Sequence, residues 1–453
     1  LYDRQPEKIN HNTLLELVID LYEAGDYAQG ITLAEKWVKQ QNVSRQEDIY
    51  PLVYYYIAYG DQNLHRKENT EQANCYMTMY VTLGENAAAD GCFPHRTEDY
   101  IVLKSLAEEY HLAMAYYYLG CLLYDRRVYD ESIEDYEESI LRSPDFPTVH
   151  RNLALAYYNV KKLPQRAYEE MEKAFALDET DARVYLELDQ LKKRLNVAVK
   201  ERWSDMEKHF DLVESRDDLY LEYVTLLNTL GEPEKALGLI KARKFHQWEG
   251  GEGKVAAQYL TALYQLAKAA VEKEDYAEAK ELLLRAVGEY PHNLGEGKLE
   301  SGQENNLYYL LGLVQEKLGE AKDAFESLTR ACCGESEPVG MMYYNDQPPE
   351  MIYYQGLAYQ MLGEEEQAVR RFQKLVDYGR EHIRDDVKID YFAVSLPDLL
   401  IFEENLNERN RKHCLFMMSL GLKGLGRIDE AEKCAEELLA MDNAHQEIRV
   451  HDL

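Results

Sequence analysis

The chain has 453 residues, 46% of them hydrophobic, so it can bury a core either as several domains or as one extended repeat array. Its 51 Lys and Arg against 83 Asp and Glu give a net charge of −32, which disfavours nucleic-acid and anionic-membrane partners and favours basic ones. No apolar run reaches the roughly 18 residues of a membrane span, and seven cysteines without a C-x-x-C motif favour reduced thiols in a cytoplasmic protein.

Taken in chain order, the sequence predicts one pair of amphipathic helices after another. In 305–317, for example, Leu307, Leu310 and Val314 fall on one stripe of a helix. Each predicted second helix carries a small residue near its start, where bulk would force the two helices apart. These residues are Gly30, Ala73, Ser132, Ala167, Ala236, Ala279, Ala324, Ala368 and Ala431. No run of strand-like alternation bounded by hairpin turns occurs, so the fold is predicted to be all-α.

Short turns separate the two helices of a pair. They read A-G-D-Y at 24–27, L-G-E-P at 230–233, K-E-D-Y at 273–276, L-G-E-A at 318–321, L-G-E-E at 362–365 and L-G-R-I at 425–428. A glycine or a short polar turn ends the first helix, and Pro233 suits the first turn of the second.

Residues 113–146 combine these features, with Leu119-Gly120 in a first helix, Ser132 and Tyr136 in a second, and Pro144 after it. The pattern resembles the tetratricopeptide repeat (TPR), a helix-turn-helix unit. The resemblance implies a right-handed α-solenoid of about nine units with inserted inter-repeat loops, in which each unit buries its apolar stripe against its neighbours.

The spacing of the small residues varies along the chain. Ser132 and Ala167 are 35 residues apart, close to the usual TPR length of about 34. The steps from Ala236 to Ala368 are 43 to 45 residues, and we place the excess in loops after each second helix. The predicted organisation is N-terminal repeats at 1–183, an inserted helical segment at 184–216, repeats with long loops at 217–380, and an insertion with a last repeat at 381–453.

The loops at 245–254, 290–304 and 334–350 are expected to lie side by side on one edge of the solenoid. The first reads F-H-Q-W-E-G-G-E-G-K, and G-E-G-K returns at 295–298. It is not a phosphate loop, because Val255 stands where a Walker motif needs Ser or Thr. Glu249 with Glu252 or Glu296 could form a carboxylate pair for acid–base chemistry. No nucleophile motif accompanies them, so we predict no catalytic residue and no cofactor.

Metal and redox sites are also disfavoured. The twelve histidines are dispersed, and His382 with Asp385 and Asp386 fits a solvated helix end better than a ligand set. Cys332 and Cys333 are sequence neighbours, and neighbours on a helix point in different directions. We therefore predict packed thiols and no metal.

Binding is better supported than catalysis. Trp248 lies in a polar, glycine-rich loop, where it either contacts a ligand or fills the gap between repeats. The predicted binding residues are His246, Trp248, Glu249, Glu252, Lys254, Glu296, Lys298, Tyr391 and Asp398. Tyrosines cluster in first helices at 54–56, 116–118, 308–309 and 353–354. Adjacent tyrosines point to different faces, so one of each set can pack inward while another faces the concave groove.

A narrower resemblance rests on the loop at 245–254 and on R-N-L-A-L-A-Y at 151–157, E-S-R-D-D-L at 214–219 and D-Y-F-A-V-S-L-P-D at 390–398. These segments resemble the C-terminal TPR region of long bacterial proteins in which an uncharacterised, carbohydrate-enzyme-like domain precedes the repeats. A chain that begins at Leu1 rather than Met is expected to be a fragment or a processed product. The resemblance implies that any catalysis lies upstream of this chain.

The favoured function is a protein-interaction or scaffold module that binds through its loops, its tyrosine-rich concave face, or both. Its partner would be a protein, a peptide or the N-terminal domain of the same polypeptide. The alternative is an accessory part of a bacterial carbohydrate-active enzyme, with carbohydrate as the ligand. A third possibility is a homo-oligomer formed through the first-helix face.

Overall fold

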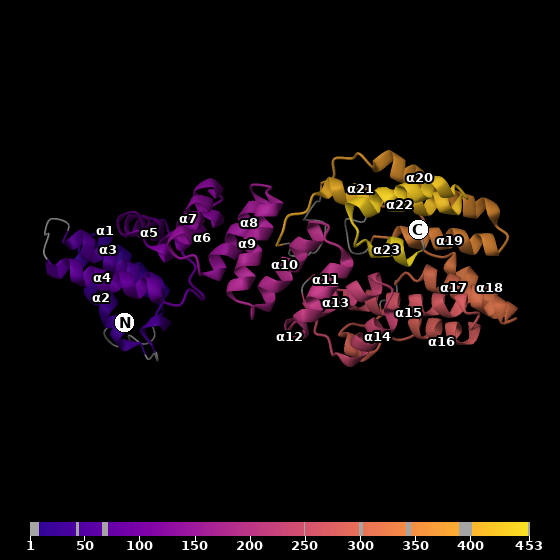
Figure 1. Ribbon diagram of the computed structural model, residues 1–453, viewed down its shortest axis with the longest axis horizontal. Coiled ribbons are helices and arrows are strands. Elements are labelled where there is room, and N and C mark those ends of the chain that lie inside the picture. The colour runs from indigo at the N-terminus through magenta and orange to yellow at the C-terminus, as the bar shows by residue number, and fades with distance from the viewer. Residues whose placement is uncertain are drawn as a thin grey trace. The chain divides into compact units, whose positions relative to one another are not determined.

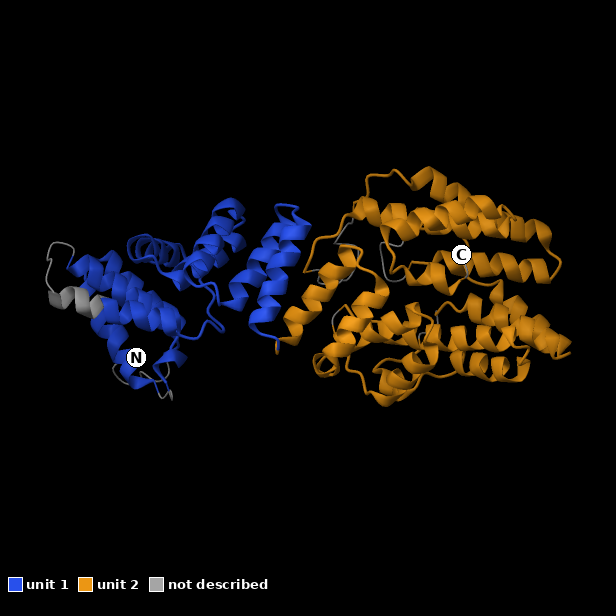
Figure 2. Cartoon of the chain, viewed as in Figure 1, with its two compact units in different colours: residues 1–179 blue, residues 180–453 orange. Residues whose placement is uncertain are grey.

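The computed structural model describes residues 9–41, 45–65, 71–248, 250–298, 302–340, 346–388 and 401–451. This part of the chain is helical and contains no strand. It divides into two compact units, unit 1 at residues 1–179 and unit 2 at residues 180–453 (Figure 2). None of its helices is both long and apolar enough to cross a bilayer.

Unit 1 consists of helix pairs and one additional helix, α5 (Figure 1). Its helices are α1 (His11–Glu23), α2 (Tyr27–Gln40), α3 (Pro51–Leu64), α4 (Glu71–Asn86), α5 (Thr97–Tyr110), α6 (Ala113–Asp125), α7 (Tyr129–Arg142), α8 (Pro147–Asn159) and α9 (Pro164–Leu177), with a 3-10 turn η2 (Gln46–Asp48) before α3. The pairs are α1 with α2, α3 with α4, α6 with α7, and α8 with α9. Helix α5 packs between the second and third pairs, against α3 and α6.

Unit 2 begins with three helices that precede its first pair, α10 (Ala182–Arg194), α11 (Val199–Lys208) and α12 (Phe210–Ser215). The predicted inserted segment at 184–216 falls on these helices. The pairs that follow are α13 (Asp217–Thr229) with α14 (Pro233–Ala242), α15 (Lys254–Glu272) with α16 (Tyr276–Ala286), α17 (Asn305–Lys317) with α18 (Ala321–Ala331), α19 (Pro349–Met361) with α20 (Glu365–His382), and α21 (Leu406–Gly424) with α22 (Ile428–Met441). A 3-10 turn η3 (His292–Leu294) lies between α16 and α17, and α23 (Gln446–Val450) ends the described chain.

Each of the nine predicted small residues lies in the second helix of a pair, and those with a described side chain are buried. Close helix approach explains Gly30, as predicted, because a Cβ atom there would lie 2.4 Å from the ring of Tyr22 on α1, and it also explains two glycines of first helices. A Cβ atom on Gly120 would lie 2.5 Å from the ring of Tyr136, and one on Gly356 would lie 2.4 Å from the ring of Phe372. The helices of these pairs can therefore touch only because the first helix carries no side chain at the crossing. The prediction of an all-α fold built from about nine helix pairs is confirmed for the described residues.

The prediction that loops account for all the excess repeat length is wrong for one step. Between Ala236 and Ala279 the loop covers only 243–253, and α15 itself has 19 residues where α13 has 13. The extra length is therefore shared between a loop and a longer first helix. In the next step α17 again has 13 residues, and the loop from the end of α16 to α17 holds the excess.

Candidate functional site

The described parts of the loops at 245–254 and 290–298 lie side by side, as predicted for these two loops, and the alignment of the third loop, 334–350, with them stays a prediction. The backbone N–H of Phe245 donates a hydrogen bond of 2.8 Å to the carbonyl of Asn293. The side-chain amide of Asn293 in turn donates to the carbonyls of Ile240 and Arg243, at 2.7 and 2.9 Å. Phe245 itself is 1% exposed. These contacts tie the second loop to the C-terminal end of α14, one repeat earlier.

The two copies of G-E-G-K have different structural roles. The first copy leads into α15, whose opening N–H groups have no partner within the helix. Glu296 of the second copy supplies one, since its carboxylate oxygens accept hydrogen bonds from the N–H groups of Gly253 and Ala256, at 2.7 and 2.8 Å. Lys298 donates to the carbonyl of Val287 at 2.6 Å and also pairs with Glu304. The second copy therefore holds the first in place.

Trp248 lies against the backbone of its own loop. A Cβ atom on Gly251 would approach the indole ring to 2.2 Å, and the Trp248 side chain is half-buried. The hollow beside it is lined by residues including His246, Glu252 and Glu296, but it holds only about 20 Å³. That space suits one water molecule and no larger ligand. The loop contacts therefore match the architectural alternative for Trp248.

The other predicted binding residues divide into three groups. His246 is anchored, because its N–H and ring Nδ1 lie 2.9 and 3.1 Å from Asp217 Oδ2, yet its side chain is 78% exposed. Glu252 and Lys254 are exposed beside it. Glu249, Tyr391 and Asp398 lie outside the described residues. The binding role of the whole set stays a prediction.

Most of the clustered tyrosines are core residues. Tyr54, Tyr55 and Tyr56 are at most 1% exposed, so no member of this triplet is open to solvent, contrary to the prediction for it. Burial raises the pKa of Tyr54 to about 12, which keeps its hydroxyl protonated. Tyr116 and Tyr308 are half-buried, and an arginine lies over the ring of each. The guanidinium of Arg142 lies 4.5 Å from the ring centroid of Tyr116, and that of Arg330 lies 4.3 Å from the ring centroid of Tyr308.

A tyrosine-lined cleft of about 220 Å³ opens in unit 1. The rings of Tyr27 and Tyr59 lie 5.0 and 6.4 Å from that of Tyr22, between centroids. The hydroxyl of Tyr22 donates a hydrogen bond of 2.8 Å to the carbonyl of Tyr56, which fixes this wall. The residues that line the cleft are Ile19, Tyr22 and Glu23 from α1, Tyr27 from α2, Tyr56 and Tyr59 from α3, and Glu98, Ile101 and Val102 from α5.

Comparison with known families identifies the helix pairs. A family model described as tetratricopeptide repeat matches residues 117–182 and 264–338, and a second model of the same description matches 350–378. These ranges cover pairs of both units, in the helices whose small residues and turns are described above. The chain contains tetratricopeptide repeats.

Several solved structures match the chain at low sequence identity. Yeast Tom70 is 10% identical, with 99% of this chain and 88% of that chain covered and a TM-score of 0.33. A human IFIT1 dimer with PPP-AAAA is 12% identical, with 96% and 92% covered and a TM-score of 0.29. Naa15/Naa10 bound to HypK-THB is 12% identical with a TM-score of 0.33; the TPR chain matches over 97% of its own length and spans 60% of that chain.

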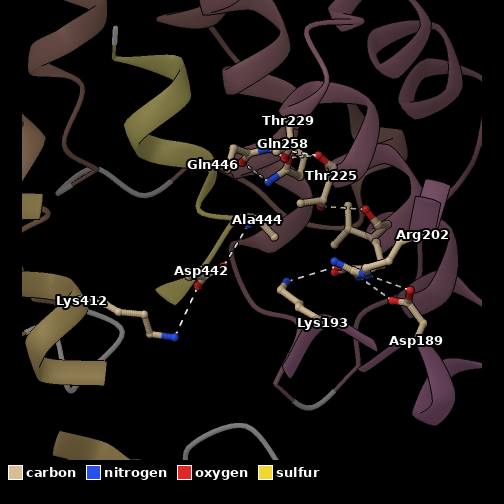
Figure 3. A network of polar contacts seen from close by, with 12 residues as sticks. Asp189, Lys193, Arg202, Thr225, Thr229, Gln258, Lys412, Asp442, Ala444 and Gln446 are labelled. Carbon is tan, nitrogen blue, oxygen red and sulfur yellow. Dashed lines mark hydrogen bonds and ion pairs between the residues drawn. The ribbon is translucent and has the colours of Figure 1, made fainter. Parts of the chain in front are cut away.

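The C-terminal helix of the TPR chain, α23, packs on the first helices of unit 2. The side-chain amide of Gln446 donates to the carbonyl of Thr225 on α13 and to Gln258 on α15, both at 3.1 Å (Figure 3). The ammonium of Lys268 on α15 donates to the carbonyl of Val450 at 2.8 Å. His451 contacts the hydroxyl of Tyr354 on α19 at 2.9 Å. The inner face of the unit 2 TPR pairs therefore already holds a short polypeptide segment.

Two cavities flank α23 on this inner face. One holds about 320 Å³ and is lined by residues including Lys268, Glu272 and Arg449. The other holds about 250 Å³ between α15, α17, α19 and α23, and Glu350 lines it. Sequence reasoning missed both cavities and the role of α23. The five residues of α23 offer no pattern that predicts a docking site, since their partners are more than 180 residues away in the chain.

Proposed function

We propose that this TPR protein is an interaction scaffold that binds a basic, apolar-containing segment of a protein partner in the tyrosine-lined cleft of unit 1. The observation that carries the proposal is the lining of that cleft. Tyrosine rings form its walls, and Ile101 lies at its side with 49% of its surface exposed. Glu23 and Glu98 add two carboxylates.

The chemistry of the cleft favours a cationic partner over an acidic one. Tyrosine faces attract Lys and Arg side chains, and rigid aromatic rings give a large contact area at low entropic cost. The net charge of −32 steers basic partners toward the chain. The loop edge at 245–254 is a weaker candidate for the same role, because Glu296 and Lys298 are engaged in holding the loops together.

Fluorescence anisotropy with synthetic peptides tests the proposal. The probes are labelled peptides that combine Lys or Arg with Leu and Phe, and versions with Glu in place of the basic residues. We expect binding of the basic peptides alone, weakened by raising the salt concentration. The Ile101→Ser variant should lose about fivefold to tenfold in affinity, or about 1 kcal/mol, from lost apolar contact.

The matched control is Leu141→Ser on α7, because Leu141 is 76% exposed and does not line the cleft. Equal losses in both variants, or binding of the acidic peptides as well as the basic ones, would contradict the proposal. The accessory role beside an upstream carbohydrate-active domain stays a prediction, as do the cytoplasmic location and a homo-oligomer.

A further inference from the structure

A buried carboxyl group without a counter-charge faces the 250 Å³ cavity of unit 2. Glu350 is the second residue of α19, it is 9% exposed, and it lines this cavity. Lysine and arginine are absent from the described residues that line the cavity. Its carboxyl accepts a hydrogen bond from its own backbone N–H. A carboxylate this deeply buried normally has a cationic partner.

The titratable groups around Glu350 do not compensate a negative charge on it, and one of them repels it. Glu447 of α23 lines the same cavity and repels a negative charge on Glu350. Burial, followed by this repulsion, raises the pKa of Glu350 to about 8, so its carboxyl is largely protonated at neutral pH. The other titratable groups of the lining are Tyr264 and His451, and burial lowers the pKa of His451 to about 3, which keeps it neutral.

The described lining of the cavity contains one unused hydrogen-bond acceptor and two engaged amide donors. The side-chain oxygen of Gln303, shielded from solvent, accepts no hydrogen bond from any residue that the structure describes. The amide nitrogens of Gln258 and Gln446 are engaged with each other's side chains at 2.9 and 3.1 Å. A positively charged ligand that donates hydrogen bonds could pair with the Glu350 carboxylate and also donate to the Gln303 oxygen. The walls between these polar groups are apolar, at Leu260, Leu307, Met351 and Val450.

We infer that this cavity is a binding site for a primary alkylammonium group, with Glu350 as its carboxylate partner and the apolar wall in contact with the alkyl chain. Glu447 has half of its side chain exposed, so the cavity is reached from solvent on the α23 side. The ammonium group can belong to a free aliphatic amine or to a lysine side chain of a partner. The inference concerns unit 2 and is independent of the cleft proposed for unit 1.

Binding should release a proton. The ammonium ion stabilises the ionised carboxylate, so Glu350 loses its proton when the ligand enters at neutral pH. Affinity is then expected to rise with pH until Glu350 is already ionised in the free protein, above pH about 8. It should fall again as the amine itself loses its charge near pH 10.

Isothermal titration calorimetry of the full chain with cadaverine and n-butylamine tests this inference. Titrations at pH 6.5, 7.5 and 8.5, in buffers of different ionisation enthalpy, measure the released proton. We expect Glu350→Gln to weaken binding at least tenfold and to abolish proton release. Because the native carboxyl is largely neutral, the amide should leave the fold intact. Glu447→Gln, on a half-exposed side chain, should weaken binding less.

The matched control is Glu366→Gln on α20, whose side chain is 92% exposed, and it should bind as the wild type does. A lysine-containing pentapeptide, compared with the free amines, identifies the source of the ammonium group. Absence of heat for all three ligands at millimolar concentration would overturn the inference. So would equal affinity in the wild type and in Glu350→Gln.

Discussion

Glu296 completes the first turn of a helix that begins 42 residues before it in the chain. Its Oε2 atom lies 2.7 Å from the backbone nitrogen of Gly253, at the N-terminus of α15. Its Oε1 atom accepts a hydrogen bond from the backbone N–H of Ala256. A helix cap is usually supplied by the residue just before the helix, so this contact joins two successive repeats as well as capping the start of a helix.

Replacing Glu296 by alanine should destabilise the junction by about 1 kcal/mol, the usual cost of losing a helix cap. Glu296→Gln keeps one oxygen acceptor and should cost less. Hydrogen exchange of the first-turn amides of α15, together with the thermal midpoint, measures both effects. Glu252→Ala is the control, because Glu252 is an exposed acid of the same loop. If Glu252→Ala accelerated exchange as much as Glu296→Ala, the cap would not be the cause.

Gly251 and Trp248 should show strong energetic coupling. A Cβ atom on Gly251 would lie 2.2 Å from the indole, so Gly251→Ala should destabilise the protein by about 1 to 3 kcal/mol through overpacking. The same substitution in a Trp248→Ala background should cost much less, because the clashing ring is gone. Urea unfolding of the two single variants and the double variant gives the coupling energy. Additive losses would show that the indole is not held against Gly251.

The His150–Glu170 pair should stabilise unit 1 most strongly within a limited pH range. Burial alone would lower the pKa of His150, but the hydrogen bonds to Glu170 and to the Pro144 carbonyl outweigh it and raise the pKa. Burial likewise opposes the lowered pKa of Glu170, which results from hydrogen bonds with His150 and Lys173. The contribution of His150 to the free energy of unfolding is therefore fully present below pH about 6.5, and it is lost as the pH rises through the folded-state pKa of His150.

The contribution of Glu170 to the free energy of unfolding is fully present above pH about 4.3, and it is lost as the pH falls through the lowered pKa of Glu170. The stability difference between the wild type and His150→Gln should thus be largest between these two values and should shrink toward pH 8. Thermal midpoints from pH 4 to 8 measure it. A difference that grew with rising pH would contradict the assignment of the proton to His150.

The repeat architecture was predictable because it depends on local rules. A small residue such as Ser132 or Ala368 must lie where two helices cross, and short turns must separate them, so both leave a mark in the sequence. Glu350 leaves no such mark. An acid after two prolines at the start of a helix is typical of an exposed first turn, whereas this one lines a cavity whose other walls come from α15, α17 and α23, far away in the chain.

The buried Arg202 is a second feature that the sequence does not reveal, since it follows from the packing of α10, α11 and α13. Its guanidinium binds Asp189 through two nitrogens, at 3.0 and 2.6 Å (Figure 3). It also binds Glu222 at 2.6 Å. The Arg202 side chain is 0% exposed and that of Asp189 is 4% exposed. Glu222 also pairs with Lys193 at 3.2 Å, so it keeps a partner when Arg202 is removed, whereas Asp189 loses both of its hydrogen bonds.

Arg202→Met should therefore destabilise unit 2 by about 3 to 5 kcal/mol, because it leaves the Asp189 carboxylate buried and uncompensated. Adding Asp189→Leu should restore much of the loss, since an apolar pair of similar size has no charge to desolvate. Calorimetric melting of the single and double variants measures both steps. Lys322→Met is the control, because the Lys322–Glu326 pair is exposed and should change stability by less than about 1 kcal/mol. If the double variant were as unstable as Arg202→Met, the loss would come from altered packing rather than from the unpaired carboxylate.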